Sequence, residues 1–329
     1  DGNKVSFTIL FDKPTDPFKA SLLKTAEAAI RLKAPNAEVT INTATRVAAP
    51  VQEKAPVLPG VKNIVAVSSG KGGVGKSTVA ANLAVALAAE GYKVGLLDAD
   101  IFGPSVPKML GLESTELYMH EVGGRNLIIP AVAYGVKVLS IGFLIDPDSA
   151  AVWRGAMASN ALKQLIEQAD WGELDYFLID MPPGTSDIHL TLVQTLGITG
   201  AVVVTTPQQV ALADARKGIA MFRDPKINVP VLGIVDNMAW FTPELHPEER
   251  YYLFGHDEAV DALAAQYEVP VLARIPLVAS VGEHSDSGRP IVTEPTASAQ
   301  AFMHLAHEVT EAVDRRNADL PPTQSVRMK

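Results

Sequence analysis

The sequence predicts an α/β fold with a doubly wound, mostly parallel sheet, preceded by a small α+β unit. Three observations carry this prediction. Short apolar runs alternate with helical stretches from residue 61 onward, as in sheets that are covered by helices on both faces. A glycine-rich loop separates the first of these runs from the first helix, and acidic residues end two later runs. In such a sheet, ligands bind at the carboxyl ends of the strands.

Residues 1–46 predict a small α+β unit that is incomplete on its N-terminal side. Residues 4–11 alternate between apolar and polar types, as a half-buried strand does. Residues 17–33 form an amphipathic helical pattern that begins at a proline, and residues 37–43 predict another short strand. Residues 47–60 contain three prolines and no periodicity, which predicts a linker.

The larger unit, residues 61–318, accounts for the other predicted elements. Its predicted strands share an apolar character and cover residues 64–68, 93–97, 136–140, 176–179, 200–204, 231–235 and 270–274. Its predicted helices share an apolar face or an Ala/Leu-rich composition and cover residues 76–90, 156–169, 187–196, 208–222, 256–266 and 297–315. Residues 319–329 include two adjacent prolines and several polar side chains, which predicts a flexible tail.

Composition narrows the range of functions. Hydrophobic residues make up 47% of the 329 residues and charged residues 20%, as in folded soluble proteins. The net charge of −9 disfavours nucleic acids and anionic membranes as partners, because phosphate surfaces require clustered Lys and Arg. No apolar run reaches the ~20 residues that span a bilayer, and no secretory signal is recognisable, so a cytoplasmic location is expected. The chain contains no cysteine, which excludes disulfides and thiolate ligands within it.

The glycine-rich loop is the most informative motif. It matches the pattern G-x-x-x-x-G-K-[ST] and comprises Gly70, Lys71, Gly72, Gly73, Val74, Gly75, Lys76, Ser77 and Thr78. Glycines allow backbone N–H groups to converge on a polyphosphate, and the N-terminus of the following helix attracts the same anion. Lys76 is expected to reach the terminal phosphates, and the Ser77 hydroxyl to bind Mg²⁺. The alternative is a glycine-rich turn without a ligand, but the flanking strand and helix favour a nucleoside triphosphate site.

Acidic residues follow two other predicted strands. Asp180 ends one of them, where phosphate-loop NTPases hold Mg²⁺, so Asp180 and Ser77 are the predicted metal site. Asp98 and Asp100 are expected to orient a water molecule or to complete the Mg²⁺ shell. Gly184 is expected to bring its backbone N–H close to a γ-phosphate and so to sense hydrolysis. Acidic residues at strand ends also occur without function, but three on one sheet with a phosphate loop favour catalysis.

Lys71 gives the loop a more specific character. The segment Lys-Gly-Gly-Val-Gly-Lys-Ser-Thr resembles the deviant phosphate loop of the MinD/ParA/nitrogenase-iron-protein class, the SIMIBI type of P-loop NTPase. The resemblance implies that Lys71 reaches across a homodimer to the partner's ATP, where a cation stabilises charge on the transferred phosphoryl group. A solvated lysine is the alternative. The predicted catalytic residues are therefore Lys71, Lys76, Asp98 and Asp100.

Further segments resemble the Mrp/ApbC family of ATP-dependent iron–sulfur cluster carriers. The segments lie between about Val61 and Arg316 and cover residues 98–105, 153–155, 175–187, 205–208, 233–238 and 285–292. The resemblance implies transfer of clusters to apoproteins, with apo iron–sulfur proteins or assembly factors as partners. It also implies that Asn237 recognises adenine and that the segment around Pro276 closes the base pocket. Residues 1–45 resemble the tail of a small domain associated with iron–sulfur assembly.

The cysteines that usually hold a cluster in this family are absent. Members commonly carry Cys-x-x-Cys shortly after the Asn-Met segment, whereas residues 241–250 contain none here, and Asp16 stands before Pro17 where the small domain often has Cys-Pro. Since clusters are held chiefly by thiolates, either the chain does related work without these ligands or other ligands serve. An iron–sulfur cluster therefore remains open as a cofactor beside ATP and Mg²⁺.

Two groups of histidines offer alternative ligands. His246 with Glu244, Glu248 and Glu249 is a candidate site for a harder metal, although a solvated charged loop is the simpler interpretation. His304 and His307 are interpreted as surface or interface residues.

The alternative function is a MinD/ParA-like positioning ATPase that carries no cluster. MinD-type proteins end in a basic amphipathic helix, which residues 319–329 do not resemble, and a net charge of −9 opposes DNA binding. A synthetase of the dethiobiotin synthase type shares the expected fold but lacks a counterpart to Lys71. The sequence therefore predicts a homodimeric ATPase of the cluster-carrier family.

Overall fold

The computed structural model describes residues 4–11, 15–45, 56–101, 103–144, 155–246, 248–323 and 325. The chain divides into two compact units, residues 1–55 and residues 56–329. Of the predicted linker, residues 47–55 lie outside the described part, whereas Leu58 is buried in the second unit. Residues 153 and 154 of the Trp-Arg-Gly segment also lie outside it.

The first unit is a βαβ arrangement with a thin core. It consists of β1 (Lys4–Phe11), α1 (Lys19–Lys33) and β2 (Glu38–Thr45), which match the predicted elements to within two residues at each end. The two strands pair in parallel, with Lys4 opposite Glu38. Phe11 is the one buried side chain among the described residues of this unit. The helix and the two strands are those predicted, and the likeness to a domain associated with iron–sulfur assembly stays a prediction.

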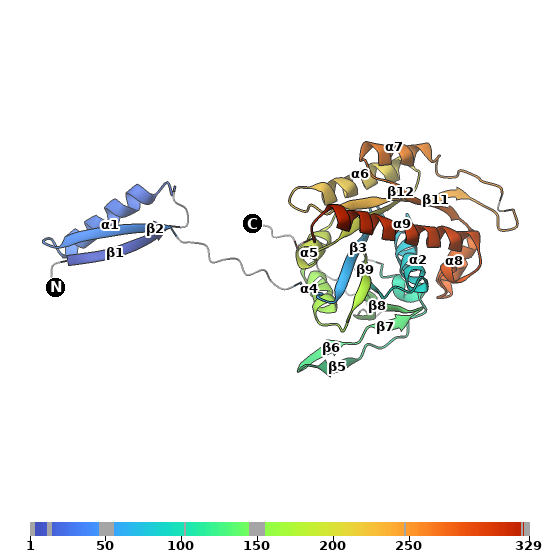
Figure 1. Cartoon of the computed structure of the whole chain (residues 1–329), viewed down its shortest axis with the longest axis horizontal. Coiled ribbons are helices and arrows are strands. Elements are labelled where there is room, and N and C mark those ends of the chain that lie inside the picture. Colours follow the sequence, from blue (N-terminus) through green and yellow to red (C-terminus); the bar gives the residue numbers. More distant parts are fainter. Residues whose placement is uncertain are drawn as a thin grey trace. The chain divides into compact units, whose positions relative to one another are not determined.

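The second unit is built on an eight-stranded sheet with the order β12-β11-β10-β3-β9-β4-β8-β7 (Figure 1). Neighbouring strands are parallel except β7, which pairs antiparallel with β8. The strands are β3 (Val61–Ser69), β4 (Val94–Asp98), β7 (Ala131–Ala133), β8 (Val136–Ser140), β9 (Leu174–Asp180), β10 (Gly200–Thr205), β11 (Val231–Phe241) and β12 (Val271–Leu277). All seven strands predicted for this unit are present, and β7 was missed because it has only three residues.

Helices cover both faces of this sheet, because neighbouring residues of a buried strand point to opposite faces. Val65 and Val67 of β3 pack in one core cluster with α2 and α9, while Ile64 and Ala66 pack in another with α4 and α5. A third cluster joins α6 and α7 to β10 and β11. The helices are α2 (Lys76–Ala89), α3 (Val106–Met109), α4 (Gly155–Glu167), α5 (Asp187–Thr195), α6 (Gln209–Arg223), α7 (Glu258–Gln266), α8 (Ala279–Asp286) and α9 (Ala297–Asp319), with 3₁₀ turns η1 (Ile141–Leu144) and η2 (Ile291–Thr293).

A hairpin outside the main sheet was not predicted. Strands β5 (Met119–Val122) and β6 (Arg125–Ile128) pair antiparallel around Gly123 and Gly124. Both glycines have positive φ, 58° and 78°, as a two-residue hairpin turn requires. The Gly-Gly pair between two short runs was the sequence signal for this hairpin.

Side-chain contacts hold the residues that follow the last helix of the second unit. The helix α9 continues to Asp319, beyond the predicted end at residue 315. Arg316 Nη2 then donates to the Pro321 carbonyl at 2.6 Å and to Thr323 Oγ1 at 2.7 Å. The first residues of the predicted flexible tail are therefore anchored to α9.

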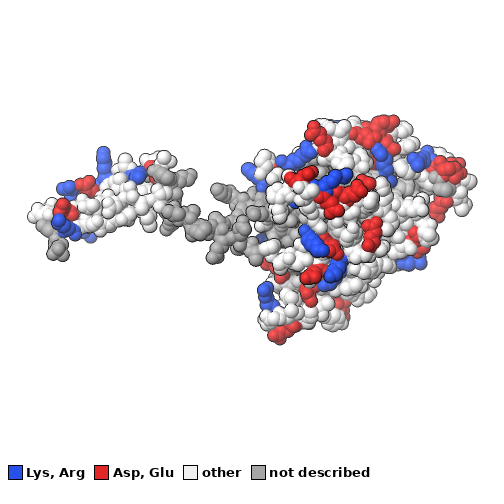
Figure 2. Space-filling view, viewed as in Figure 1, with Lys and Arg blue, Asp and Glu red and all other residues white. Residues whose placement is uncertain are grey.

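The surface carries charged side chains of both signs, as the composition predicts. Figure 2 shows Lys and Arg interspersed with Asp and Glu over the visible face of the larger unit. Among the described helices, none combines the length and the apolar character needed to cross a bilayer.

Candidate functional site

The phosphate loop joins β3 to α2 at the carboxyl edge of the sheet. Gly73 and Gly75 have φ values of 83° and 79°, and Gly75 is the N-cap of α2. These left-handed conformations favour glycine at both positions. A Cβ at Gly70 would lie 2.1 Å from the Asp214 carbonyl carbon of α6, so the start of the loop packs directly on that helix.

An open cavity of about 210 Å³ lies at this loop. Its lining comprises loop residues and side chains from the segments after β4 and β9, namely Ser69, Lys71, Gly72, Gly73, Gly75, Lys76, Ser77, Thr78, Asp100, Ser105, Met109 and Pro183. A larger cavity of about 430 Å³ lies at the opposite edge of the sheet, beside Pro230, Pro270 and Arg316. The smaller cavity is the candidate site because the glycine loop, a lysine and carboxylates meet there.

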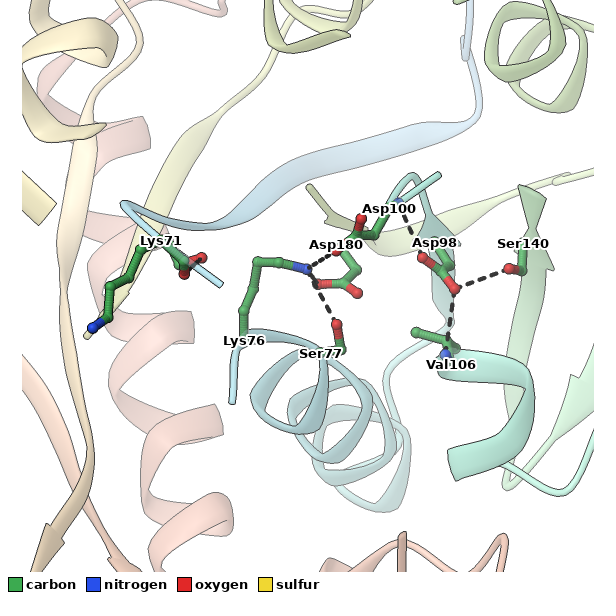
Figure 3. A network of polar contacts seen from close by, with 9 residues as sticks. Lys71, Lys76, Ser77, Asp98, Asp100, Val106, Ser140 and Asp180 are labelled. Carbon is green, nitrogen blue, oxygen red and sulfur yellow. Dashed lines mark hydrogen bonds and ion pairs between the residues drawn. The ribbon is translucent and has the colours of Figure 1, made fainter. Parts of the chain in front are cut away.

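Lys76 is the centre of the polar network in this cavity. Its side chain is 6% exposed, and Nζ lies 2.5 Å from Asp180 Oδ1 and 3.6 Å from Asp100 Oδ2 (Figure 3). Nζ also donates to Ser77 Oγ at 3.1 Å. Asp180, Asp100 and Ser77, which come from three separate segments of the chain, are thus brought together around the Lys76 ammonium group.

Asp180 and Ser77 are placed suitably for a divalent cation. Asp180 is fully buried at the end of β9, and burial raises the pKa of its carboxyl while Lys76 and Ser77 oppose the rise. Its Oδ2 has no hydrogen-bond partner among the described residues. The Lys76 ammonium donates to both the Ser77 hydroxyl and an Asp180 oxygen, so these two oxygen atoms lie close to one another. A hydroxyl and a carboxylate are hard oxygen donors, which suit Mg²⁺.

The Asp98 carboxylate accepts hydrogen bonds from other groups of the protein. Its two oxygens accept hydrogen bonds from the Asp100 N–H at 3.1 Å, the Val106 N–H at 3.3 Å and Ser140 Oγ at 2.9 Å (Figure 3). Burial, with the nearby charge of Asp180, raises the pKa of Asp98 to about 8 against these bonds. Asp98 therefore anchors α3 and β8 to the site, and Asp100 rather than Asp98 lines the cavity.

Lys71 also lines the cavity but points elsewhere. Its side chain is partly exposed and extends away from Lys76 and Asp180 (Figure 3). No carboxylate among the described residues forms a salt bridge with it. This orientation is compatible with a target outside its own site.

Gly184 contacts the residue before the phosphate loop, and Asn237 contacts the middle of the loop. Gly184, with a φ of 77°, donates its N–H to the Ser69 carbonyl at 2.9 Å. The Asn237 amide donates to the Val74 carbonyl at 2.7 Å. The predicted roles in sensing phosphate and recognising adenine remain predictions, as does that of Pro276, which is buried at the end of β12.

Some residues of the site were missed from the sequence. Ser105 and Met109 line the cavity because α3 begins six residues after Asp100, and the Gly-Pro-Ser turn before α3 was the available signal. His189 is buried below the turn after β9, three residues after the N-cap Ser186. That spacing is the capping-box spacing, but the box normally carries Glu or Gln.

The segment that lacks cysteines forms an exposed loop after β11. Phe241 and Tyr251 close it through two backbone hydrogen bonds of 2.8 and 2.9 Å. His246 Nδ1 lies 3.3 Å from Glu248 Oε1, and Glu249 accepts a 2.6 Å hydrogen bond from the Tyr251 hydroxyl. These side chains are exposed, as are those of His304 and His307 on α9, which agrees with their interpretation as solvated surface residues.

Comparisons with known proteins agree with this geometry. Residues 60–310 match a family model of the ParA group described as NUBPL iron-transfer P-loop NTPase. An iron–sulfur cluster carrier protein from Synechocystis sp. is 43% identical over 318 residues, which cover 95% of this chain and 88% of that protein. The iron–sulfur cluster transfer protein NUBPL from Mus musculus is 47% identical over 257 residues, which cover 77% of this chain and 78% of that protein.

A solved structure shares the fold. A nucleotide-binding protein from Archaeoglobus fulgidus, in complex with ADP, superimposes with a TM-score of 0.62 at 40% identity and covers 72% of this chain and 91% of its own. The match of residues 60–310 includes the phosphate loop, the three acidic residues and Asn237. The chain therefore belongs to the NUBPL-type iron-transfer P-loop NTPases of the ParA family.

Proposed function

We propose that the chain is a homodimeric, ATP-hydrolysing switch that acts in the transfer of iron–sulfur clusters to apoproteins. The observation that carries this proposal is the convergence of Lys76, Asp180, Ser77 and Asp100 beneath a glycine-rich loop. Family membership supports a role in cluster transfer over the MinD-like alternative, because the relatives described above are named as carrier or transfer proteins.

Each residue has a defined part in this function. The N–H groups of the phosphate loop and the N-terminus of α2 bind the phosphates. Lys76 leaves Asp180 and neutralises the terminal phosphates, which frees the Asp180 carboxylate. Ser77 and Asp180 would then hold Mg²⁺, whose charge offsets that of the phosphate oxygens. Asp100, which lines the cavity, orients the attacking water.

Lys71 is proposed to complete the site of the second protomer. Its side chain extends away from its own Lys76, so it serves a phosphate bound to the facing copy. A positive charge supplied in this way stabilises the transition state of phosphoryl transfer without contributing to the resting site.

Mixed protomers test both the ATPase activity and the dimer. Lys71→Ala is expected to bind Mg-ATP but to hydrolyse it at least ~10³-fold more slowly, as when an arginine finger is removed. Lys76→Ala is expected to be inactive because it does not hold the phosphates. A mixture of the two variants should recover activity, since Lys71 of the Lys76→Ala protomer completes the intact site of the other. A mixture as inactive as its components would contradict action across the dimer.

The cluster is cargo that this chain cannot hold through thiolates. None of its 329 residues is cysteine, and iron–sulfur clusters are held chiefly by cysteine thiolates. The exposed His246, Glu248 and Glu249 are hard or intermediate ligands, which do not suit such a cluster. We therefore assign the thiolate ligands to partner proteins and the nucleotide-driven switch to this chain.

A further inference from the structure

The turn between β9 and α5, residues 182–186, lies beside the phosphate loop. Directly before it, Met181 donates its backbone N–H to the Val67 carbonyl at 3.0 Å, and within it Gly184 donates to the Ser69 carbonyl at 2.9 Å. A Cβ at Gly184 would stand 3.8 Å from the Gly70 carbonyl oxygen. The turn is thus held against the end of β3, where the phosphate loop begins.

His189 holds the opposite side of this turn. The Ser186 N–H donates to His189 Nδ1 at 3.1 Å, and the Ser186 hydroxyl lies 3.2 Å from the same nitrogen. Ser186 is the N-cap of α5 and His189 is its third helical residue, so the two form a reciprocal capping box. The imidazole therefore fixes the last residue of the turn.

The imidazole is buried and neutral. Its exposed fraction is 1%, and burial lowers the pKa of His189 to about 4, with the charge of Lys76 acting in the same direction. Nε2 of the ring has no hydrogen-bond partner among the described residues. Because Nδ1 accepts the Ser186 N–H, the neutral ring carries its proton on Nε2. The ring thus fixes the last residue of the turn, while the Met181 N–H fixes the residue before the turn to β3.

We propose that His189 is a positioning residue that holds residues 182–186 so that the Gly184 N–H stands at the phosphate loop. The inference rests on the proposed ATPase function and deepens it. With Met181 held by Val67 of β3 and Ser186 held by the ring, Gly184 is the point at which the turn can rotate, and its φ of 77° suits glycine. When a triphosphate binds, the Gly184 N–H leaves the Ser69 carbonyl and donates to a phosphoryl oxygen. After hydrolysis it donates to the Ser69 carbonyl again.

Three variants of the full chain test this role. His189→Leu keeps a similar volume but removes the acceptor for the Ser186 N–H. His189→Gln restores an acceptor, since Gln is a usual partner in a capping box. Thr195→Val is the matched control, because it removes a 2.7 Å hydrogen bond to the Thr191 carbonyl on the same helix. For each variant, kcat and KM for ATP, the Kd for Mg-ADP and the melting temperature are measured.

The expected pattern separates positioning from folding. His189→Leu should lower kcat by about tenfold or more, within the ~10²-fold that a small misplacement costs. Its Kd for Mg-ADP should stay within about twofold of the wild-type value, because ADP lacks the phosphate that Gly184 contacts. His189→Gln should return kcat to near the wild-type value, and Thr195→Val should leave it unchanged.

Several results would overturn the role of His189. These are an unchanged kcat in His189→Leu, a His189→Gln variant as slow as His189→Leu, or a parallel loss of Mg-ADP binding. Should His189→Leu fail to fold, His189→Met, which fills the space without a strong hydrogen-bond acceptor, takes its place in the same comparison. An inactive wild-type protein would refute the proposed ATPase function itself, whereas an active wild type with an unaffected His189→Leu variant would refute only this inference.

Discussion

Lys76 places one positive charge between the carboxylates of Asp180 and Asp100, with the Ser77 hydroxyl as a third contact. Two carboxylates in one buried site repel each other unless a cation lies between them. Lys76 supplies that cation to the protein's own carboxylates. In the proposed function, a nucleotide with Mg²⁺ would supply the anion that Lys76 then contacts and the cation that replaces Lys76 beside the carboxylates. The same charges thus account for a stable resting site and for a site that responds to nucleotide.

This cluster could be predicted from the sequence because its members follow strands whose carboxyl ends meet at one edge. A second acidic cluster, around the buried Asp236, could not be predicted in this way. Asp236 on β11 lies opposite Arg274 on β12, and the two become neighbours only through the strand register. Arg274 Nε lies 3.8 Å from Asp236 Oδ2 and 3.7 Å from Asp257 Oδ2, and its Nη2 contacts Asp261. Pairing of this kind depends on tertiary structure rather than on local pattern.

Asp236 leads to a prediction about stability and pH. Burial, followed by the charge of Asp257, raises the pKa of Asp236 to about 7, against the attraction of Arg274. A carboxyl with a raised pKa binds a proton in the folded state that the unfolded chain has already lost, so stability falls as pH rises from about 4 to about 7. Asp236→Asn removes this dependence.

The measurement is urea unfolding at pH 5 and pH 8. Relative to Asp236→Asn, the wild-type protein should lose on the order of 2–3 kcal/mol more of its free energy of unfolding between these values, at about 1.4 kcal/mol per pKa unit. Parallel pH profiles for the two proteins would show that Asp236 titrates normally.

At the level of elements, the phosphate loop is fixed by its contact with α6. Gly70 begins the loop, and a Cβ there would lie 2.3 Å from the Asp214 carbonyl oxygen and 2.4 Å from the Ala215 nitrogen. These are backbone atoms of a helix, which cannot move aside as a flexible side chain does. The loop and α6 must therefore separate if this glycine is replaced.

Gly70→Ala should destabilise the protein by at least about 2 kcal/mol, since overpacking against backbone costs typically 1–3 kcal/mol or more. Gly72→Ala is the matched control in the same loop, because a Cβ at Gly72 has nothing within 4 Å. Thermal denaturation without nucleotide compares the two variants. Equal melting temperatures for both would contradict the close packing of the loop on α6.

The elements that the sequence predicted share length and a continuous apolar pattern. The elements that it missed are short or exposed: α3 has four residues, and α8 has no buried residue. The Val106 N–H of α3 is held by the Asp98 carboxylate rather than by a helical pattern. Such elements depend on tertiary contacts, which a single sequence does not reveal.

At the scale of the whole molecule, the chain joins a nucleotide site typical of a cluster-carrier family to a sequence without cysteine. This combination predicts a switch that drives transfer without ligating the cluster itself. Anaerobic incubation of the isolated protein with iron and sulfide, followed by desalting, should leave it colourless and free of stoichiometric iron. A stable visible absorption band with bound iron would contradict the assignment of the cluster ligands to partner proteins.

The central claim is that the cavity at the phosphate loop binds a nucleotide with Mg²⁺. Calorimetric titration of the wild-type protein with Mg-ATP, beside Lys76→Ala and the control Lys217→Ala, tests it most directly. Lys217 is an exposed residue of α6 that pairs with Asp214 at 3.0 Å. Wild type and Lys217→Ala should bind equally, and Lys76→Ala should bind at least about tenfold more weakly, because it loses a charge-assisted hydrogen bond to phosphate. An absence of binding by the wild type, or equal affinity in Lys76→Ala, would contradict the account.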